Sequence, residues 1–316
     1  MQKKQFQYVR TFAPASVSNL NCGFDVLGFA LHAPGDEVEL RRNNSGVVSI
    51  ETITGDGGLL PRDADKNTAS AVVRLFLDKI GSRQGIAVGI HKKMPLNSGL
   101  GSSAASSVAA LLAVNTLMGE PLARKELLPL AMEGERLACG NAHADNVAPA
   151  LFGGLVLIRS YTPLDIVQLP VPETLFCAII HPEVSVPTRE ARSILPEKIP
   201  LRDAVKQWGN VAGLVAALYS NDLSLLGRSM TDHIVEPVRE HLIPDFNTMK
   251  QLATDAGAIA FGISGSGPTV FAFADGLPKA QNIAKPISAF LTSSKMPHQV
   301  YLSAINPLGA QLLIAE

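Results

Sequence analysis

The segment of this chain whose residues best suit chemistry is rich in glycine and serine and lies between a predicted strand and a predicted helix. It consists of Pro95, Leu96, Asn97, Ser98, Gly99, Leu100, Gly101, Ser102, Ser103, Ala104 and Ala105. Glycines let the backbone approach a ligand closely, and serine hydroxyls can donate hydrogen bonds. The free N–H groups at a helix start carry about half a positive charge, which favours a phosphate. The segment therefore predicts a phosphate-binding loop.

The same segment lacks two common nucleotide-binding fingerprints. It contains no G-x-x-x-x-G-K-[ST] and no G-x-G-x-x-G after a strand, which argues against a P-loop and a dinucleotide fold. A helix start that uses small residues only for tight packing is one alternative. A membrane span is another, because residues 94–119 carry no charge. Lipid would leave their many Asn, Ser and Thr side chains poorly satisfied, so we expect a buried helix behind a polar loop.

The overall composition is that of an ordinary globular protein with two domains. The chain has 316 residues, 47% of them hydrophobic, and its 27 basic and 28 acidic residues give a formal charge of -1. Because no block of like charges occurs, we expect neither nucleic acid nor a membrane as a partner. The basic N-terminal start has no apolar stretch of signal-peptide length, and the cysteines form no C-x-x-C pair. We therefore expect reduced thiols and a cytoplasmic location.

Hydrophobic periodicity predicts an α+β protein whose halves meet at a proline-bearing stretch. In the first half it predicts strands at 8–12, 37–41, 47–53, 86–91 and 154–159 and helices at 67–80, 104–115 and 122–138. In the second half it predicts strands at 175–180, 258–263, 269–274 and 299–304 and helices at 188–194, 201–219, 246–255 and 279–291. The stretch at 161–172 is rich in proline, so we predict one domain over residues 1–160 and a second over residues 161–316.

Three motifs resemble, in the same order, those of the GHMP kinases, the family named for galactose, homoserine, mevalonate and phosphomevalonate. The central one is P-x-x-S-G-L-G-S-S-A-A at residues 95–105. The first, APASVSNLNCGFDVLG at residues 13–28, is similar to that of the homoserine-phosphorylating members in particular. The segment GISGSGPT at residues 262–269 resembles the third motif of the family. The tracts at 141–149, 186–192 and 232–239 resemble the substrate region of the homoserine-phosphorylating members.

This resemblance implies a fold, two substrates and a metal site. The fold would combine an N-terminal α/β domain like that of a small ribosomal protein with a C-terminal ferredoxin-like domain, and the site would lie between them. The substrates would be ATP and L-homoserine, and the product O-phospho-L-homoserine would belong to threonine biosynthesis. Ser103 and Glu135 would hold Mg²⁺, which prefers hard oxygen ligands, although Glu133 is an alternative to Glu135. We also expect a homodimer.

The resemblance also assigns residues to the two charges of the zwitterionic acceptor. Arg192 and Arg239 would grip its carboxylate, because a planar guanidinium group can donate two parallel hydrogen bonds. Asn19 and Asp25 would accept hydrogen bonds from its ammonium group. The alternative for the two arginines is an ordinary surface ion pair.

A further group of residues would surround the acceptor hydroxyl. These residues are His143, Asp145, Asn146 and Thr188. No basic residue occurs between Arg10 and Arg41, so the lysine or arginine that mevalonate kinase and galactokinase place in the first motif is missing. Phosphoryl transfer with a loose transition state depends mainly on positioning and charge stabilisation. We therefore expect Asp145 and Asn146 to act by orienting the hydroxyl. The structural alternatives are a helix cap for Asp145 and a satisfied buried histidine for His143.

Two positions depart from the family pattern. Asn21 and Cys22 stand where Gly-Pro is usual, and Asn97 stands where many members have glycine. Asparagine tolerates left-handed backbone geometry better than most residues, so we expect both turns to be kept.

Two other functions compete with this hypothesis. The first is a kinase for a mevalonate-like acceptor, against which the missing basic residue of the first motif argues. The second is a non-catalytic protein of the same fold that binds a metabolite. Loss of Ser103, Glu135 or Asp145 would indicate the second function, and all three are present.

Overall fold

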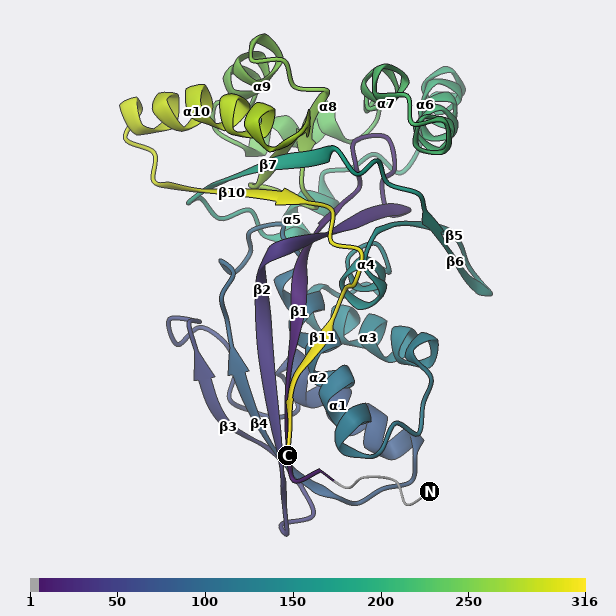
Figure 1. The fold of residues 1–316 in the computed structure, drawn as a ribbon, viewed down its shortest axis with the longest axis vertical. Helices are drawn as coiled ribbons and strands as arrows, with labels where there is room; N and C mark the ends of the chain where they lie inside the picture. Colours follow the sequence, from purple (N-terminus) through teal and green to yellow (C-terminus); the bar gives the residue numbers. More distant parts are fainter. Residues whose placement is uncertain (1–5) are drawn as a thin grey trace.

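Residues 6–316, which the computed structural model describes, form two β-sheets with helices packed against them (Figure 1). The strands are β1 (Tyr8–Ser18), β2 (Leu27–Asn43), β3 (Val48–Thr54), β4 (Gly85–His91), β5 (Leu155–Tyr161), β6 (Leu164–Leu169), β7 (Leu175–Pro182), β8 (Ala260–Ile263), β9 (Val270–Asp275), β10 (His298–Ala304) and β11 (Gln311–Ala315). The helices are α1 (Thr68–Lys79), α2 (Ser102–Leu117), α3 (Arg124–Cys139), α4 (Val147–Phe152), α5 (Thr188–Ser193), α6 (Leu201–Ser220), α7 (Leu223–Ser229), α8 (Glu236–Arg239), α9 (Phe246–Asp255) and α10 (Leu277–Ser293), with a 3₁₀ turn at Glu240–Leu242. The predicted α+β class is confirmed.

The first sheet has seven strands and carries the phosphate loop. Five strands follow the order β11-β1-β2-β4-β3, with β5 beside β2 and β6 beside β5. Fully buried side chains such as Val9, Leu40, Phe76 and Leu111 form the core between this sheet and helices α1 and α2. The division into domains at residues 160 and 161 stays a prediction, and the first sheet extends past it, because β6 and the C-terminal β11 belong to this sheet.

The second sheet has the strand order β10-β7-β9-β8, with all neighbours antiparallel, which is the order of a ferredoxin-like βαββαβ unit. Successive side chains of its central strands point to opposite faces, and both faces are buried. Ile180 of β7 packs in the core with α9 and α10, whereas Ile179 belongs to the core of the first sheet. There the rings of Phe29 and Phe273 lie 5.2 Å apart. One face of the second sheet therefore shares the core of the first sheet, and its other face forms a separate core with α9 and α10.

The main differences from the predicted elements have local causes. Strands β1 and β2 are longer than predicted, because Pro14 and Pro34 interrupt the alternation on which the prediction rested, and the ladder accommodates this with a register shift between Pro14 and Ser16. The unpredicted elements α4, α7, α8, β6 and β11 have seven residues or fewer.

Three predictions from composition can be compared with the described residues. No helix there is long and apolar enough to cross a bilayer, and α2 takes up only 16 residues of the uncharged stretch. Cys22 and Cys177 are free, buried thiols, as expected, whereas the side chain of Cys139 lies outside the described part of the structure. The first five residues of the basic N-terminal start also lie outside it.

A buried ion pair attaches the first turn of α2 to the first sheet. The ammonium group of Lys92, just after β4, contacts the carboxylate of Asp36 in β2, and both side chains are buried. It also donates to the carbonyl oxygen of Ser102 (2.9 Å) and to the hydroxyl of Ser106 (2.8 Å). Asp36 in turn accepts from both serine hydroxyls and from the backbone N–H of Lys93. These bonds hold the helix start next to the phosphate loop.

We predict that Asp36→Ala strongly destabilises the protein, because the ammonium of Lys92 would stay buried without a countercharge. The free energy of unfolding, measured by denaturant titration, should fall by about 3–5 kcal/mol. The double variant Lys92→Met with Asp36→Asn should lose less, since it leaves no buried charge and the asparagine oxygen can still accept from the two serine hydroxyls. Equal losses in the single and double variants would contradict this account.

Candidate active site

The phosphate loop joins β4 to α2 and requires glycine at two positions. Gly99 and Gly101 have φ angles of +80° and +66°, which other residues rarely adopt. A Cβ atom at Gly99 would lie 2.3 Å from the carbonyl oxygen of Ser264, and one at Gly101 would lie 2.3 Å from the hydroxyl of Ser16. No side chain caps the N-terminus of α2. Its first N–H groups can therefore face a phosphate, as the sequence predicted.

The three motifs, far apart in the sequence, meet at this loop. The hydroxyl of Ser264 in the third motif donates to the carbonyl oxygen of Gly99 (2.7 Å). The backbone N–H of Ser16 in the first motif donates to the carbonyl oxygen of Leu100 (3.0 Å). The resemblance in the order of the motifs thus corresponds to direct contacts between them.

Asparagine preserves the turns at the two positions that depart from the family pattern. Asn21 and Asn97 have φ angles of +56° and +53°, in the left-handed region, so this prediction is confirmed. The side chain of Asn21 also donates to the carbonyl oxygen of Phe261 (2.8 Å) and to the carboxylate of Glu236 (3.1 Å). It thereby ties the first-motif loop to the second sheet and to α8.

Two adjoining cavities open beside the loop. The larger, of about 600 Å³, is lined by the loop residues Leu96, Asn97, Ser98, Gly99, Gly101, Ser102 and Ser103 and by Leu59, Leu60, Pro61 and Leu137. The predicted loop residues Leu100, Ala104 and Ala105 are instead buried in the core. The smaller, of about 210 Å³, is lined by the predicted acceptor residues Asn19, Asp25, His143, Asp145, Asn146, Thr188, Arg192 and Arg239. Asn146, Thr188 and Glu135 line both cavities. The structure therefore places a volume suited to a nucleotide next to one suited to a small polar molecule.

Ser103 and Glu135 meet in the larger cavity. The hydroxyl of Ser103 donates to Oε1 of Glu135 (2.6 Å), and burial of this carboxyl raises its pKa. Glu133 is exposed and pairs instead with Arg136 (3.0 Å). Of the two glutamates considered from the sequence, Glu135 is thus the one beside the loop. Among residues 6–316 no cluster of three His, Cys, Asp or Glu side chains could hold a metal, but a hydroxyl with a buried carboxylate suits Mg²⁺.

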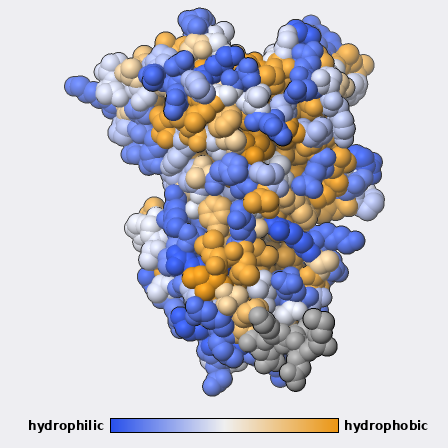
Figure 2. Space-filling model, in the orientation of Figure 1, coloured by the Kyte–Doolittle hydropathy of each residue, from blue (hydrophilic) through white to orange (hydrophobic). Residues whose placement is uncertain are grey.

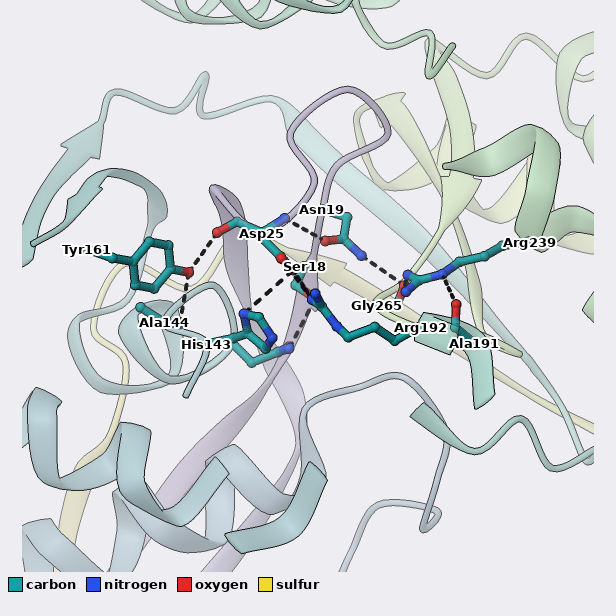
Figure 3. A network of polar contacts seen from close by, with 11 residues as sticks. Ser18, Asn19, Asp25, His143, Ala144, Tyr161, Ala191, Arg192, Arg239 and Gly265 are labelled. Carbon is teal, nitrogen blue, oxygen red and sulfur yellow. Dashed lines mark hydrogen bonds and ion pairs between the residues drawn. The ribbon is translucent and has the colours of Figure 1, made fainter. Parts of the chain in front are cut away.

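Arg239 is a buried cation on the wall of the smaller cavity (Figure 3). Its guanidinium donates to the carbonyl oxygens of Ala191 and Gly265, both at 3.0 Å, and lies 5.1 Å from the ring centroid of Phe24. The side chain is only 3% exposed, and burial, together with nearby Arg192, lowers its pKa to about 10. Within the described residues its direct partners are therefore uncharged. An anionic ligand in the cavity would supply the missing countercharge.

Arg192 and Asp25, assigned from the sequence to opposite charges of the acceptor, pair with each other. Nη2 of Arg192 donates to both carboxylate oxygens of Asp25, at 2.6 and 2.7 Å (Figure 3). Asn19 positions Asp25 by accepting from its backbone N–H (3.1 Å), and it donates to the carbonyl oxygen of Gly265 (2.8 Å). Direct contact of Arg192, Asp25 or Asn19 with an acceptor stays a prediction, and it would require this pair to open or to share its hydrogen bonds.

Two buried polar atoms in the smaller cavity have no hydrogen-bond partner among the described residues. They are Oδ1 of Asp145 and Nε2 of His143. Burial, together with neighbouring carboxylates, raises the pKa of Asp145 to about 7, and burial lowers the pKa of His143. Neither structural alternative fits, since α4 has no side-chain cap and Nε2 of His143 has no partner, although its Nδ1 lies 3.7 Å from Oδ1 of Asp25. Unsatisfied buried atoms of this kind are typical of a site for a polar ligand.

Some residues at the site gave no signal in the sequence. The Tyr161 hydroxyl donates to the carbonyl oxygen of Asp25 (2.7 Å) and accepts from the backbone N–H of Ala144 (3.2 Å) (Figure 3). It thereby connects two loops of the smaller cavity. Arg189 lines both cavities from α5. Tyr161 lies in the stretch predicted to separate the two domains, and Arg189 lies next to Thr188, which the resemblance had already assigned to the site. Only the structure therefore identifies these two residues.

The fold and the phosphate loop together define a kinase of the GHMP class. A family model described as "GHMP kinases N terminal domain" matches residues 67–154, and one described as "GHMP kinases C terminal" matches residues 214–292. The homoserine kinase of Chloroherpeton thalassium is 48% identical over 316 residues, which cover 96% of this chain and 99% of that protein. The homoserine kinase of Xylella fastidiosa strain M12 is 38% identical and covers 96% and 94%. This chain belongs to the homoserine kinase family.

Solved structures agree with this assignment. The crystal structure of homoserine kinase from Cytophaga hutchinsonii matches with a TM-score of 0.96 and 53% sequence identity, over 99% of each chain. The mevalonate kinase of L. major, in complex with R-mevalonate, matches with a TM-score of 0.75 at 18% identity, and therefore shares the fold alone.

We predict that Asp145→Asn stabilises the protein at neutral and alkaline pH but not at acid pH. Because the folded-state pKa of about 7 lies above the ordinary value of 3.8, the folded protein binds this proton more tightly. That contribution to stability is complete below about pH 4 and is lost as the pH rises through about 7. Above that pH the gain from asparagine should reach up to about 4 kcal/mol. Calorimetric unfolding across this range would show it, and a gain independent of pH would contradict it.

Proposed function

We propose that this protein transfers the γ-phosphoryl group of ATP to the side-chain hydroxyl of L-homoserine, giving O-phospho-L-homoserine in threonine biosynthesis. The observation that carries the proposal is the buried cation Arg239, which faces a small polar cavity beside a phosphate loop. A carboxylate on the acceptor would neutralise it. Membership of the homoserine kinase family supports the same acceptor. A mevalonate-like acceptor is less well supported, since the first motif lacks a basic residue.

The larger cavity would hold ATP. Its phosphates would face the N-terminus of α2, and its base would pack on the apolar wall that includes Leu59 and Leu137. Ser103 and Glu135 would hold Mg²⁺, which would neutralise charge on the phosphates.

The smaller cavity would orient the acceptor. Arg239 would hold the carboxylate, while Asp145, ionised above about pH 7, would accept a hydrogen bond from the hydroxyl. Asn146 would also orient the hydroxyl. Two hydrogen bonds fix its side chain, which accepts from the hydroxyl of Ser16 (2.8 Å) and donates to that of Ser18 (3.0 Å). In a loose transition state the hydroxyl proton can pass to the transferred phosphoryl group, so alignment is the main task of these residues. We also propose a cytoplasmic location, which suits the free thiols of Cys22 and Cys177.

We predict that homoserine is the best acceptor in an ADP-release assay that also includes mevalonate, galactose and shikimate. Arg239→Lys should raise KM for homoserine about 10- to 100-fold and KM for ATP much less, because lysine keeps the charge but loses the planar fork. Faster turnover of mevalonate by the parent enzyme would contradict the proposed function.

An amino alcohol without the carboxylate is the matched control for this variant. It should be a poor substrate of the parent enzyme and suffer little further from Arg239→Lys, because the contact is already missing. Equal harm to both acceptors would show that Arg239 supports the fold or the nucleotide site instead.

We predict that Glu135→Ala lowers magnesium-dependent turnover about 100-fold or more, whereas Glu133→Ala leaves it near normal. The first residue contacts Ser103 in the larger cavity, and the second pairs with Arg136 on the outside. Turnover measured over a range of Mg²⁺ concentrations should show the defect of Glu135→Ala partly relieved by excess metal. A defect confined to Glu133→Ala would exclude Glu135 as the ligand.

A further inference from the structure

Arg189 is the one cation among the described residues that lines both cavities of the site. It belongs to α5, which lies at the level where the two sheets meet (Figure 1), and Figure 2 shows the left outline of the molecule drawn in at about this level. The other residues that line both cavities are uncharged or, in the case of Glu135, acidic. In the described part of the chain, the boundary between the cavities therefore carries a single positive side chain.

Contacts on either side of Arg189 hold α5 at this boundary. Before it, the hydroxyl oxygens of Thr188 and Ser266 lie 3.2 Å apart, which ties the helix to the third motif. After it, Arg192 donates to both carboxylate oxygens of Asp25 in the first motif (Figure 3). Arg189 itself makes no hydrogen bond or ion pair with any residue from 6 to 316. Its guanidinium group is therefore available to a ligand.

The other cations of the larger cavity already have carboxylate partners. Lys92 is buried against Asp36, and the ammonium group of Lys66 lies 3.4 Å from the carboxylate of Asp63. Among the described residues that line this cavity, Arg189 is thus the cation without a carboxylate beside it. The two arginines of the smaller cavity are those assigned to the acceptor carboxylate, which leaves Arg189 for the phosphoryl group.

Phosphoryl transfer requires positive charge at this boundary. The bond from the γ-phosphorus to the ADP oxygen breaks as a bond to the acceptor oxygen forms, and the hydroxyl proton passes to the transferred group. In the transition state negative charge is spread over the three equatorial oxygens of that group, and an arginine or a lysine commonly stabilises it. The first motif of this chain has no basic residue. The charge must therefore come from another part of the sequence.

We propose that Arg189 is a catalytic residue that contacts the transferring phosphoryl group and stabilises its charge in the transition state. This role rests on the proposed function, because it takes the larger cavity as the site of ATP and the smaller one as the site of the acceptor. Arg192 follows three residues later on the same helix, and side chains with this spacing are neighbours. Helix α5 would thus serve both the acceptor carboxylate and the phosphoryl group.

Steady-state kinetics of two substitutions test this role. Arg189→Ala should lower kcat about 100- to 1000-fold, because the stabilising charge is lost. KM for homoserine should change less than about threefold, since the contact is made mainly in the transition state. Arg189→Lys should retain more activity than Arg189→Ala, because it keeps the charge without the planar fork. An unchanged kcat in Arg189→Ala would overturn the proposal.

Arg202→Ala is the matched control for the loss of an arginine. Arg202 lies on α6, its side chain is 82% exposed, and it lines neither cavity. Its kcat should stay within about twofold of the parent value, since surface substitutions away from contacts have small effects. An equal loss in Arg202→Ala and Arg189→Ala would show that net charge, rather than a contact of Arg189, governs the rate.

A complex of ADP, tetrafluoroaluminate, Mg²⁺ and homoserine gives a readout that does not depend on turnover. The fluoride group takes the place of the transferring phosphoryl group, so Arg189→Ala should weaken its binding about as much as it lowers kcat. Binding of ADP with Mg²⁺ alone should change less than about threefold, because ADP lacks that group. Equilibrium titration measures both. An equal loss for ADP and for the fluoride complex would assign Arg189 to the nucleotide site or the fold and overturn the proposal.

Failure of the proposed function would give a different result. The parent enzyme itself would then turn over another acceptor faster than homoserine. The variant would in that case be assayed with the preferred acceptor. There a loss of about 100-fold in kcat supports the role of Arg189, and a normal kcat excludes it.

Discussion

The contact between Lys92 and Asp36 is the interaction on which the geometry of the site most depends. It joins β2, the end of β4 and the first turn of α2, and the phosphate loop connects β4 to α2. A buried ion pair contributes little net stability compared with apolar packing of the same volume, because desolvation offsets the attraction. Its effect here is positional: the helix start, with its unpaired N–H groups, is fixed relative to the sheet before any phosphate binds.

The smaller cavity shows a second consequence of burying charge. Arg239 and Asp145 are both almost completely buried, and each has its pKa moved toward the uncharged form. Neither is neutralised by a direct partner of opposite charge among the described residues. Such an arrangement costs stability in the free protein, and it is retained where a ligand supplies the missing contacts. A small molecule that carries both a carboxylate and a hydroxyl would supply both missing contacts.

Helix α6 connects this cavity to the outer surface. On its inner side Gln207 donates to the carbonyl oxygen of Cys22 in the first-motif loop and to the carboxylate of Asp232, both at 2.9 Å. Asp232 accepts in turn from the backbone at the start of α8, which ends at Arg239. On its outer side the same helix exposes Trp208 and Tyr219. Helix α6 therefore helps to set the position of Arg239.

Local chemistry in the sequence was enough to predict the phosphate loop, the left-handed turns at Asn21 and Asn97 and most of the longer helices and strands. These features depend on residues close together in the chain. The resemblance already favoured Glu135 over Glu133, and the structure places Glu135 against Ser103. The structure alone showed that Arg192 pairs with Asp25 and that the C-terminal strand returns to the first sheet. Those contacts join segments far apart in the chain, so their partners are set by packing and leave no periodic or local pattern. The short helices α4, α7 and α8 were missed for a related reason, since four to seven residues contain too few turns to display a helical period.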